Sequence, residues 1–195
     1  MLTGDWFATP RSKKEIAAVA NAWLDYFDYW HHYVSNLPGI LEHDLPLLVP
    51  KFILMVREDS EMGDVLATTS FDPPQIVFRC STYRELIRGD GRARFTAAHE
   101  LGHLLLHSTD KELHRAAQPN YGRIDNRSLS AEWQADTFAS NFLMPEHIAR
   151  TFSSPDELAQ NCQVSLAAAQ HRMTELGTWP KAKLIPDLSF LNKYR

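Results

Sequence analysis

Hydrophobic residues in the first part of the chain recur at the spacing of an amphipathic helix. Ser12 and Glu15 form a capping-box pattern at its start, and Asn36-Leu-Pro-Gly39 carries residues typical of a helix end. Between them, apolar side chains fall three or four positions apart, which places them on one helix face. We therefore predict a long helix over residues 13–35. Its apolar positions are Ile16, Val19, Ala20, Trp23, Leu24, Phe27, Trp30 and Val34.

Three segments in the next part of the chain have the composition of β-strands. Residues 51–58, 65–70 and 75–80 are rich in β-forming residues and are separated by turn signals that contain glycine or proline. Neighbouring strands this close in the sequence can form a hairpin. We expect a small antiparallel sheet of about three strands. Thr82 and Glu85 form a second capping box, which predicts that a short helix begins at Thr82.

A second amphipathic pattern predicts a helix that begins near Arg92 and reaches His107. Its apolar positions include Ala98, Leu101, Leu104 and Leu105, and its polar stripe contains His99, Glu100, His103 and His107. A solvated helix face more usually carries lysine and glutamate. Polar residues confined to one stripe of an apolar helix therefore indicate a site that is walled by the core.

The polar stripe contains an H-E-x-x-H string, from His99 to His103. Two histidines four residues apart lie on one helix face, so both can bind one metal ion from the same side. Glu100 lies about 100° around the helix axis from His99, where it can reach a water on the ion instead of binding the ion. Two imidazoles and one carboxylate suit a zinc hydrolase with Glu100 as its general base. The alternative is a chance string of core histidines.

A catalytic zinc usually takes three protein ligands, so the two histidines need a third partner. One subclass of H-E-x-x-H enzymes has glycine and histidine where this chain has Leu106 and Thr109, so that arrangement is excluded. His107 lies too far along a straight helix, because eight residues at about 1.5 Å each separate it from His99 by about 12 Å. The third ligand is therefore expected on another helix.

The helix predicted over residues 131–144 offers that ligand. Glu132 and Asp136 lie four residues apart on one face, beside small residues that permit a close helix approach. We predict Glu132 as the third ligand. Asp136, one turn later, is placed to accept the outer N–H of His99 or His103, as carboxylates commonly do around metal sites. The alternative is a solvated helix face.

The last part of the chain predicts two short helices joined by a turn. Ser154-Pro-Asp-Glu157 is a complete helix start, and a second helix over residues 166–176 ends at Gly177. This spacing is typical of a helix-turn-helix unit, but residues 146–195 are nearly neutral in charge. The pattern favours packing or partner binding over DNA recognition, and we expect no direct DNA binding.

Composition indicates an ordinary globular chain: 44% of residues are hydrophobic, 23% are charged, and the net charge is −4. We expect one domain over residues 1–150, which contains the H-E-x-x-H helix, and a C-terminal helical part over 151–195 packed on it. The apolar runs are too short to span a membrane, and no secretory signal is recognisable. Cys80 and Cys162 match no disulfide or zinc spacing. A cytoplasmic location, with an intracellular substrate, is therefore expected.

Two motifs in this order resemble those of the ImmA/IrrE family of zinc metallopeptidases. They are Arg94-Phe-Thr-Ala-Ala-His-Glu-Leu-Gly-His-Leu-Leu-Leu-His107 and Glu132-Trp-Gln-Ala-Asp-Thr-Phe-Ala139, followed by Leu143-Met-Pro145, and the similarity covers about residues 75–180. The resemblance implies a zincin-like, gluzincin-type fold of the α+β class, mainly helical with a small sheet. It implies one zinc ion on His99, His103 and Glu132, with Glu100 as base. Manganese or cobalt suit the same ligands.

The resemblance also implies a function. Members of this family are intracellular endopeptidases that cut helix-turn-helix repressors, often encoded beside them, and so relieve repression of mobile-element or stress-response genes. Two alternatives stay open: a zinc-containing regulator that binds a repressor or DNA without catalysis, and a protease toxin whose partner is an antitoxin. Glu100 favours an enzyme over the regulator, since a structural zinc site needs no base.

A polar stretch over residues 108–130 joins the two helices predicted to hold the metal. Long loops of this kind are often functional, so His114 and Tyr121 are candidates to contact substrate or to stabilise a developing oxyanion. An ordinary surface loop is the alternative. His107 is a third candidate for the same contact, or else a group that lies beside a metal ligand.

Overall fold

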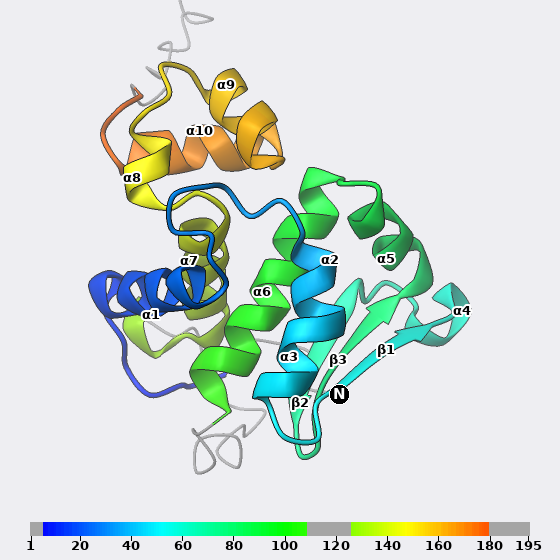
Figure 1. The fold of residues 1–195 in the computed structure, drawn as a ribbon. Helices are drawn as coiled ribbons and strands as arrows, with labels where there is room; N and C mark the ends of the chain where they lie inside the picture. Colours follow the sequence, from blue (N-terminus) through cyan, green and yellow to red (C-terminus); the bar gives the residue numbers. More distant parts are fainter. Residues whose placement is uncertain (1–5, 109–125, 180–195) are drawn as a thin grey trace, which may run out of the picture.

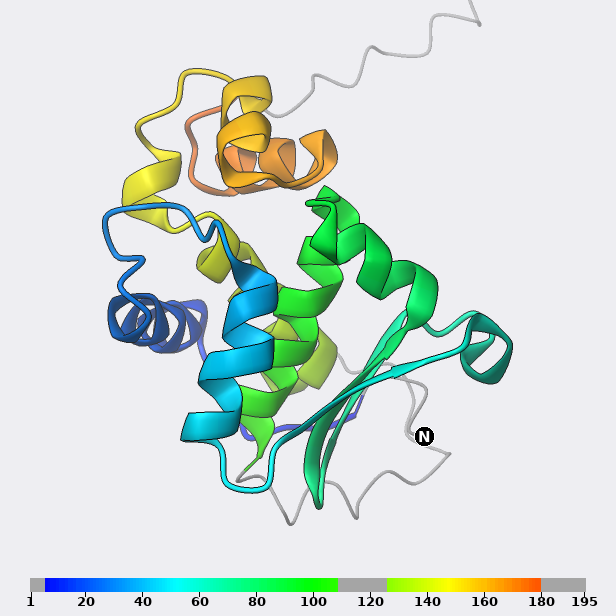
Figure 2. The ribbon, with the colours of Figure 1, turned by 45° about the vertical axis from the view of Figure 1, so that its right-hand side comes forward.

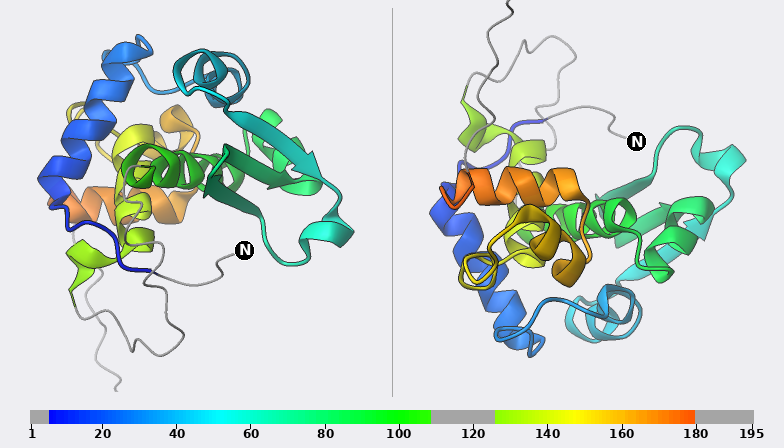
Figure 3. Two further views of the ribbon diagram at one scale, coloured as in Figure 1. Left: turned by 90° about the horizontal axis from the view of Figure 1, so that it is seen from below. Right: turned by 90° about the horizontal axis from the view of Figure 1, so that it is seen from above.

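The fold is arranged around one central helix. The computed structural model describes residues 6–108 and 126–179, and α6 (Gly91–His107) runs through the middle of it (Figure 1). Asp90 caps α6 because its side chain accepts two backbone N–H groups of the first turn. α7 (Ala131–Leu143) packs along α6, and the strands β2 (Ala67–Phe71) and β3 (Pro74–Arg79) contact α6 as well. Figure 3 places the sheet and α1 (Lys13–Tyr26) on opposite sides of α6.

The helix at the N-terminal side, α1, is shorter than its hydrophobic pattern predicts. The capping box of Ser12 and Glu15 is confirmed, but α1 spans Lys13–Tyr26 and does not reach residue 35. Asp28 takes a positive φ of 59°, which ends the helix. Val34 is nevertheless fully buried. The apolar spacing continued beyond the helix because an irregular segment also buries its side chains.

The expected helix end at residues 36–39 is in fact a helix start. The Asn36 side chain accepts the Gly39 N–H at 3.0 Å, and Pro38 lies in the first turn. Proline there leaves no unpaired N–H and has a φ that suits the helix. The helical stretch continues through α2 (Leu37–Gly39), a π-helical turn and α3, which together cover residues 37–48.

The sheet has three strands, as predicted, but it is mixed and not antiparallel. Its strands are β1 (Ile53–Arg57), β2 (Ala67–Phe71) and β3 (Pro74–Arg79), in the order β1-β3-β2. β2 and β3 form the expected hairpin, whereas β1 pairs with β3 in parallel. The prediction was wrong because β3 carries the most buried strand residues and takes both neighbours. Figure 2 shows the sheet beside α6 and α5.

The predicted capping box at Thr82 is wrong. α4 (Asp59–Met62) occupies the expected turn between β1 and β2, and α5 (Cys80–Ile87) begins directly after β3. Thr82 is therefore buried inside α5. Instead of a local cap, Asp59 of α4 accepts the Ser81 N–H at 2.9 Å. A tertiary contact thus replaces the cap that the local sequence suggested.

The C-terminal part contains α8 (Glu146–Ala149), α9 (Pro155–Cys162) and α10 (Leu166–Glu175). The predicted cap at Ser154 is confirmed. The turn between α9 and α10 packs on α6, where buried Arg94 donates from Nε to the Gln163 carbonyl at 3.0 Å. The helix-turn-helix order is as expected, and the domain division at residue 150 stays a prediction. Within the described residues, no helix has the length and apolar character to cross a bilayer.

Candidate metal centre

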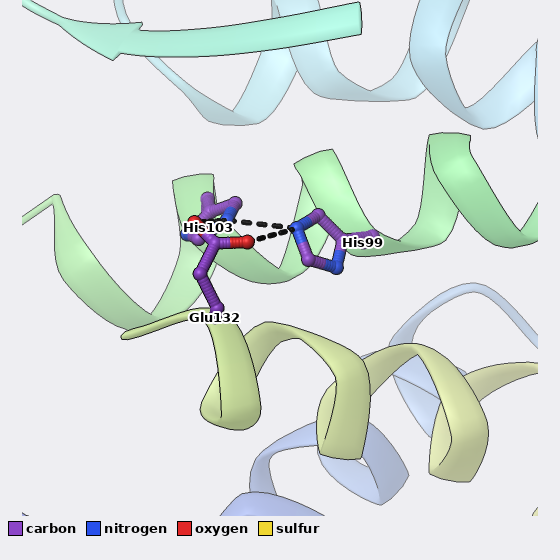
Figure 4. A group of neighbouring side chains, drawn as sticks. All are labelled: His99, His103 and Glu132. Atoms are coloured by element: carbon purple, nitrogen blue, oxygen red, sulfur yellow. Dashed lines mark hydrogen bonds and ion pairs between the residues drawn. The ribbon is translucent and has the colours of Figure 1, made fainter. Parts of the chain in front are cut away.

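Three predicted ligands converge at the contact between α6 and α7. His99 and His103 lie one turn apart on α6, and their Nε2 atoms are 2.9 Å apart. Glu132, in the first turn of α7, places one carboxylate oxygen 3.2 Å from His99 Nε2 and the other 3.4 Å from His103 Nε2. Figure 4 shows these three side chains pointing toward one another. Of the described residues, only these form a group that could hold a metal ion.

The convergence depends on a close approach between the two helices. Gly102 lies between the histidines on α6, and a Cβ at this position would be 3.1 Å from the Phe138 ring and 3.2 Å from the Ala135 carbonyl oxygen of α7. A larger residue would push α7 and its Glu132 away from the histidines. Ser130 fixes the start of α7 by accepting the Trp133 N–H at 3.0 Å, which places Glu132 in the first turn.

The donor set fits a zinc-type ion. Tetrahedral ligands at about 2.1 Å from one ion lie roughly 3.4 Å from each other, and the three contacts among His99, His103 and Glu132 measure 2.9, 3.2 and 3.4 Å. Two imidazoles and one carboxylate match the protein ligands of catalytic zinc sites, which keep a further position for water. Manganese and cobalt accept the same set. The residues present therefore fit a divalent transition-metal ion.

The histidine and carboxylate groups at the centre shift the pKa values of one another. Burial lowers the pKa of His99, but hydrogen bonds to Asp136 and Glu132 outweigh it and raise this pKa to about 10. Burial raises the pKa of Glu132, yet the two neighbouring imidazoles, of His103 and His99, lower it well below its usual value. The raised pKa favours the protonated form of His99, and a metal ion would compete with that proton because metal ligands must be deprotonated.

Asp136 lies where the sequence placed it. Its Oδ1 accepts a hydrogen bond from His99 Nδ1 at 2.8 Å, and this leaves His99 Nε2 directed at the other two ligands. Carboxylates in this position hold a metal-bound imidazole in one orientation and increase its basicity. Asp136 contacts His99 and not His103.

Glu100 is buried on α6 beside the cluster, with 7% of its surface exposed. Thr69 of β2 donates its hydroxyl proton to Glu100 Oε2 at 2.6 Å and also lies 3.0 Å from the Glu100 carbonyl oxygen. The sequence pattern did not point to Thr69. A threonine in a predicted strand carries no signal for this role, because only the folded sheet brings it to α6.

His107 is fully buried, and it lies beside the candidate metal ligand His103. Its Nδ1 is 3.2 Å from His103 Nδ1, and its Nε2 is 3.2 Å from Gln134 Oε1. This position suits the role of a group beside a ligand better than that of a substrate contact. His114 and Tyr121, the other candidates for substrate contact, lie outside the described residues.

An N-terminal segment covers the same side of the site. Trp6 stacks on His103 with ring centroids 4.8 Å apart and ring planes 27° apart. The backbone of this segment pairs with the chain before α7, through Ala8 N–H to the Leu129 carbonyl at 2.8 Å and Ala131 N–H to the Trp6 carbonyl at 3.1 Å. The sequence pattern did not point to Trp6, since nothing local connects it to residues about one hundred positions away.

Comparison with known families agrees with this geometry. Residues 88–174 match the model of the Peptidase_M78 family, described as the IrrE N-terminal-like domain. The matched segment contains α6, α7 and all three candidate ligands, and it confirms the resemblance to the ImmA/IrrE family. The family is one of metallopeptidases. A search of curated proteins returned no match.

Proposed function

We propose that this chain is a zinc-dependent endopeptidase. The observation that carries the proposal is the convergence of His99, His103 and Glu132 beside the buried carboxylate of Glu100. When bound, zinc supplies a polarised water and a Lewis acid for the scissile carbonyl. Glu100 takes the proton from this water and returns it to the leaving amine. A purely structural site would have no need of this carboxylate.

The edge of the sheet is consistent with a peptide or protein as the substrate. β2 is an edge strand, and within the described residues no strand pairs with its outer side. A peptide in extended conformation can add to such an edge through backbone hydrogen bonds. Thr69 of β2 touches Glu100, so a peptide added along this strand would pass near the proposed base. An extended linker between domains of a protein substrate suits this arrangement.

The proposed substrate is an intracellular helix-turn-helix repressor, whose cleavage would relieve repression. This part of the proposal rests on the resemblance to the ImmA/IrrE family. An antitoxin of similar architecture would be cut by the same chemistry.

Co-expression with a helix-turn-helix repressor encoded next to this chain tests the proposal. We expect one discrete cut in the repressor. Glu100→Gln should lower the cleavage rate by about 10²–10⁴-fold, because it removes the base but keeps the shape of the side chain. Its zinc content, measured by metal analysis, should stay unchanged. Glu85→Gln, at an exposed position of α5, is the matched control and should cleave normally. Normal cleavage by zinc-loaded Glu100→Gln would contradict the assignment.

A further inference from the structure

The side-chain amide of Gln134 is held in one orientation by groups that can only donate, or can only accept, a hydrogen bond. Its Nε2 donates to the carbonyl oxygens of Thr9 and Ser128, at 2.9 and 2.8 Å. Its Oε1 accepts from Arg11 Nη1 at 3.2 Å. Carbonyl oxygens only accept and guanidinium nitrogens only donate, so the amide cannot be reversed. The group that Gln134 presents to His107 is therefore an acceptor oxygen.

This acceptor determines where the proton of His107 lies. His107 Nε2 is 3.2 Å from Gln134 Oε1, so Nε2 must carry a proton to donate. A neutral imidazole has one N–H, which leaves His107 Nδ1 as an acceptor. That atom is 3.2 Å from His103 Nδ1, so His103 must donate from Nδ1.

The same tautomer is the one that a metal ligand requires. With its proton on Nδ1, His103 keeps a free lone pair on Nε2, the atom that faces His99 and Glu132. The opposite tautomer would place a proton on Nε2 and block the site. The orientation of the Gln134 amide thus favours the same tautomer of His103 that metal binding requires.

Burial protects this chain of hydrogen bonds. Gln134 and His107 are fully buried, and His103 is 3% exposed. Trp6 covers both rings, stacked on His103 and edge-on to His107 with centroids 6.0 Å apart. Buried hydrogen bonds of this kind are strong and specific, because the low local dielectric strengthens them.

We infer that Gln134 and His107 are positioning residues that hold His103 in the Nδ1–H tautomer and so prepare its Nε2 to bind the metal. The N-terminal segment takes part through Thr9 and Arg11, which orient Gln134. The inference rests on the metal centre of the proposed function and does not depend on the substrate or the reaction.

Tautomers can be read directly by long-range ¹H–¹⁵N spectra of the zinc-loaded full chain labelled with ¹⁵N-histidine. We expect His103 to carry its proton on Nδ1 and His107 to carry a single proton on Nε2. A proton on Nδ1 of His107, in either its neutral or its charged form, would overturn the inference. A wild-type chain that binds no zinc would instead overturn the metal centre itself.

Zinc affinity, measured by competition with a chromophoric chelator, gives a second test. His107→Leu removes the acceptor and should weaken zinc binding by about 10- to 100-fold. His107→Gln offers a carbonyl oxygen to His103 and an N–H group to Gln134, so it should keep an affinity within a few-fold of wild type. His171→Leu, at an exposed position of α10, should change nothing. Equal affinity of His107→Leu and wild type would overturn the inference.

Discussion

The two histidine ligands differ in how their outer nitrogens are held. His99 bonds to Asp136, whose side chain is 59% exposed, whereas His103 bonds to the fully buried His107. A carboxylate at the surface can exchange its bond with water, but a buried imidazole cannot. We therefore expect His103 to be held more rigidly than His99. His99 is also the more exposed of the two, with 17% of its side chain exposed against 4% for His103.

Thr69 is the residue that we expect to tune the proposed base. Thr69→Val keeps the shape of the side chain but removes the hydroxyl that donates to Glu100 at 2.6 Å. One hydrogen bond to a charged group contributes about 1.5–3 kcal/mol, so kcat should fall by about ten- to a hundredfold. KM and zinc content should stay near wild type, and Thr69→Ser should retain most of the activity. Steady-state kinetics on a peptide substrate separates these outcomes, and a rise in KM alone would refute the role.

Capping patterns in the sequence predicted a helix start correctly where the capping side chain and the N–H group that it accepts lie in the same helix. Ser12 and Ser154 each cap the helix that the sequence predicted for them. Thr82 failed because Asp59, from another element, satisfies the N–H group of Ser81. A capping motif thus predicts a helix start only when no distant group supplies the same hydrogen bond.

The contact between α6 and the turn before α10 depends on Gly91. A Cβ at Gly91 would lie 2.5 Å from the Val164 carbonyl carbon and 2.6 Å from Ser165 N, and backbone atoms cannot yield easily. Gly91→Ala should therefore lower the free energy of unfolding by about 1–3 kcal/mol, measured by urea denaturation. Arg92→Ala, at the next and exposed position, is the control and should stay near wild type. Equal stability of Gly91→Ala and wild type would show that the turn can move away.

Glu175 ties α10 to α1 and gives a pH-dependent contribution to stability. Burial raises the pKa of Glu175, but Lys13, which donates at 2.6 Å, and Arg172 lower it below its ordinary value of 4.5. A lowered pKa in the folded state stabilises the fold above the unfolded pKa, and this contribution is lost as the pH falls through the folded value.

Glu175→Gln should therefore lower the free energy of unfolding by about 1 kcal/mol at pH 7. The difference from wild type should shrink as the pH falls below about 4.5, because the wild-type carboxylate then becomes protonated as well. Urea denaturation at pH 7 and pH 3.5 measures both values. A difference that stays the same at the two pH values would contradict the assigned ion pairs.

For the whole molecule, the metal should act as a cross-link between α6 and α7. Zinc at 100 times its dissociation constant should raise the free energy of unfolding by about 2.7 kcal/mol, because it binds only the folded site. Addition of a chelator should reverse this gain, and Glu132→Gln should remove most of it. Thermal unfolding with and without zinc measures the effect. Equal unfolding temperatures in the two conditions would argue against the metal centre.

The spacing of residues in the sequence was enough to predict which side chains would form the candidate metal centre. Spacing placed His99 and His103 on one face, exclusion of His107 pointed to a ligand on another helix, and Glu132 lay there with Asp136 one turn later. The convergence of these side chains could be predicted because helix geometry converts residue spacing into direction over short distances. The helical pattern of α6 and α7 was accurate for the same reason.

Only the tertiary structure decided which distant groups meet. Periodicity records that a side chain is buried, but not what covers it, so the parallel pairing of β1 with β3 could not be read from the strands. The same limit hid Thr69 beside Glu100, and the path from Gln134 through His107 to His103. The candidate ligands of this centre can thus be recognised from local residue spacing. The groups that orient them are brought beside them only by tertiary packing.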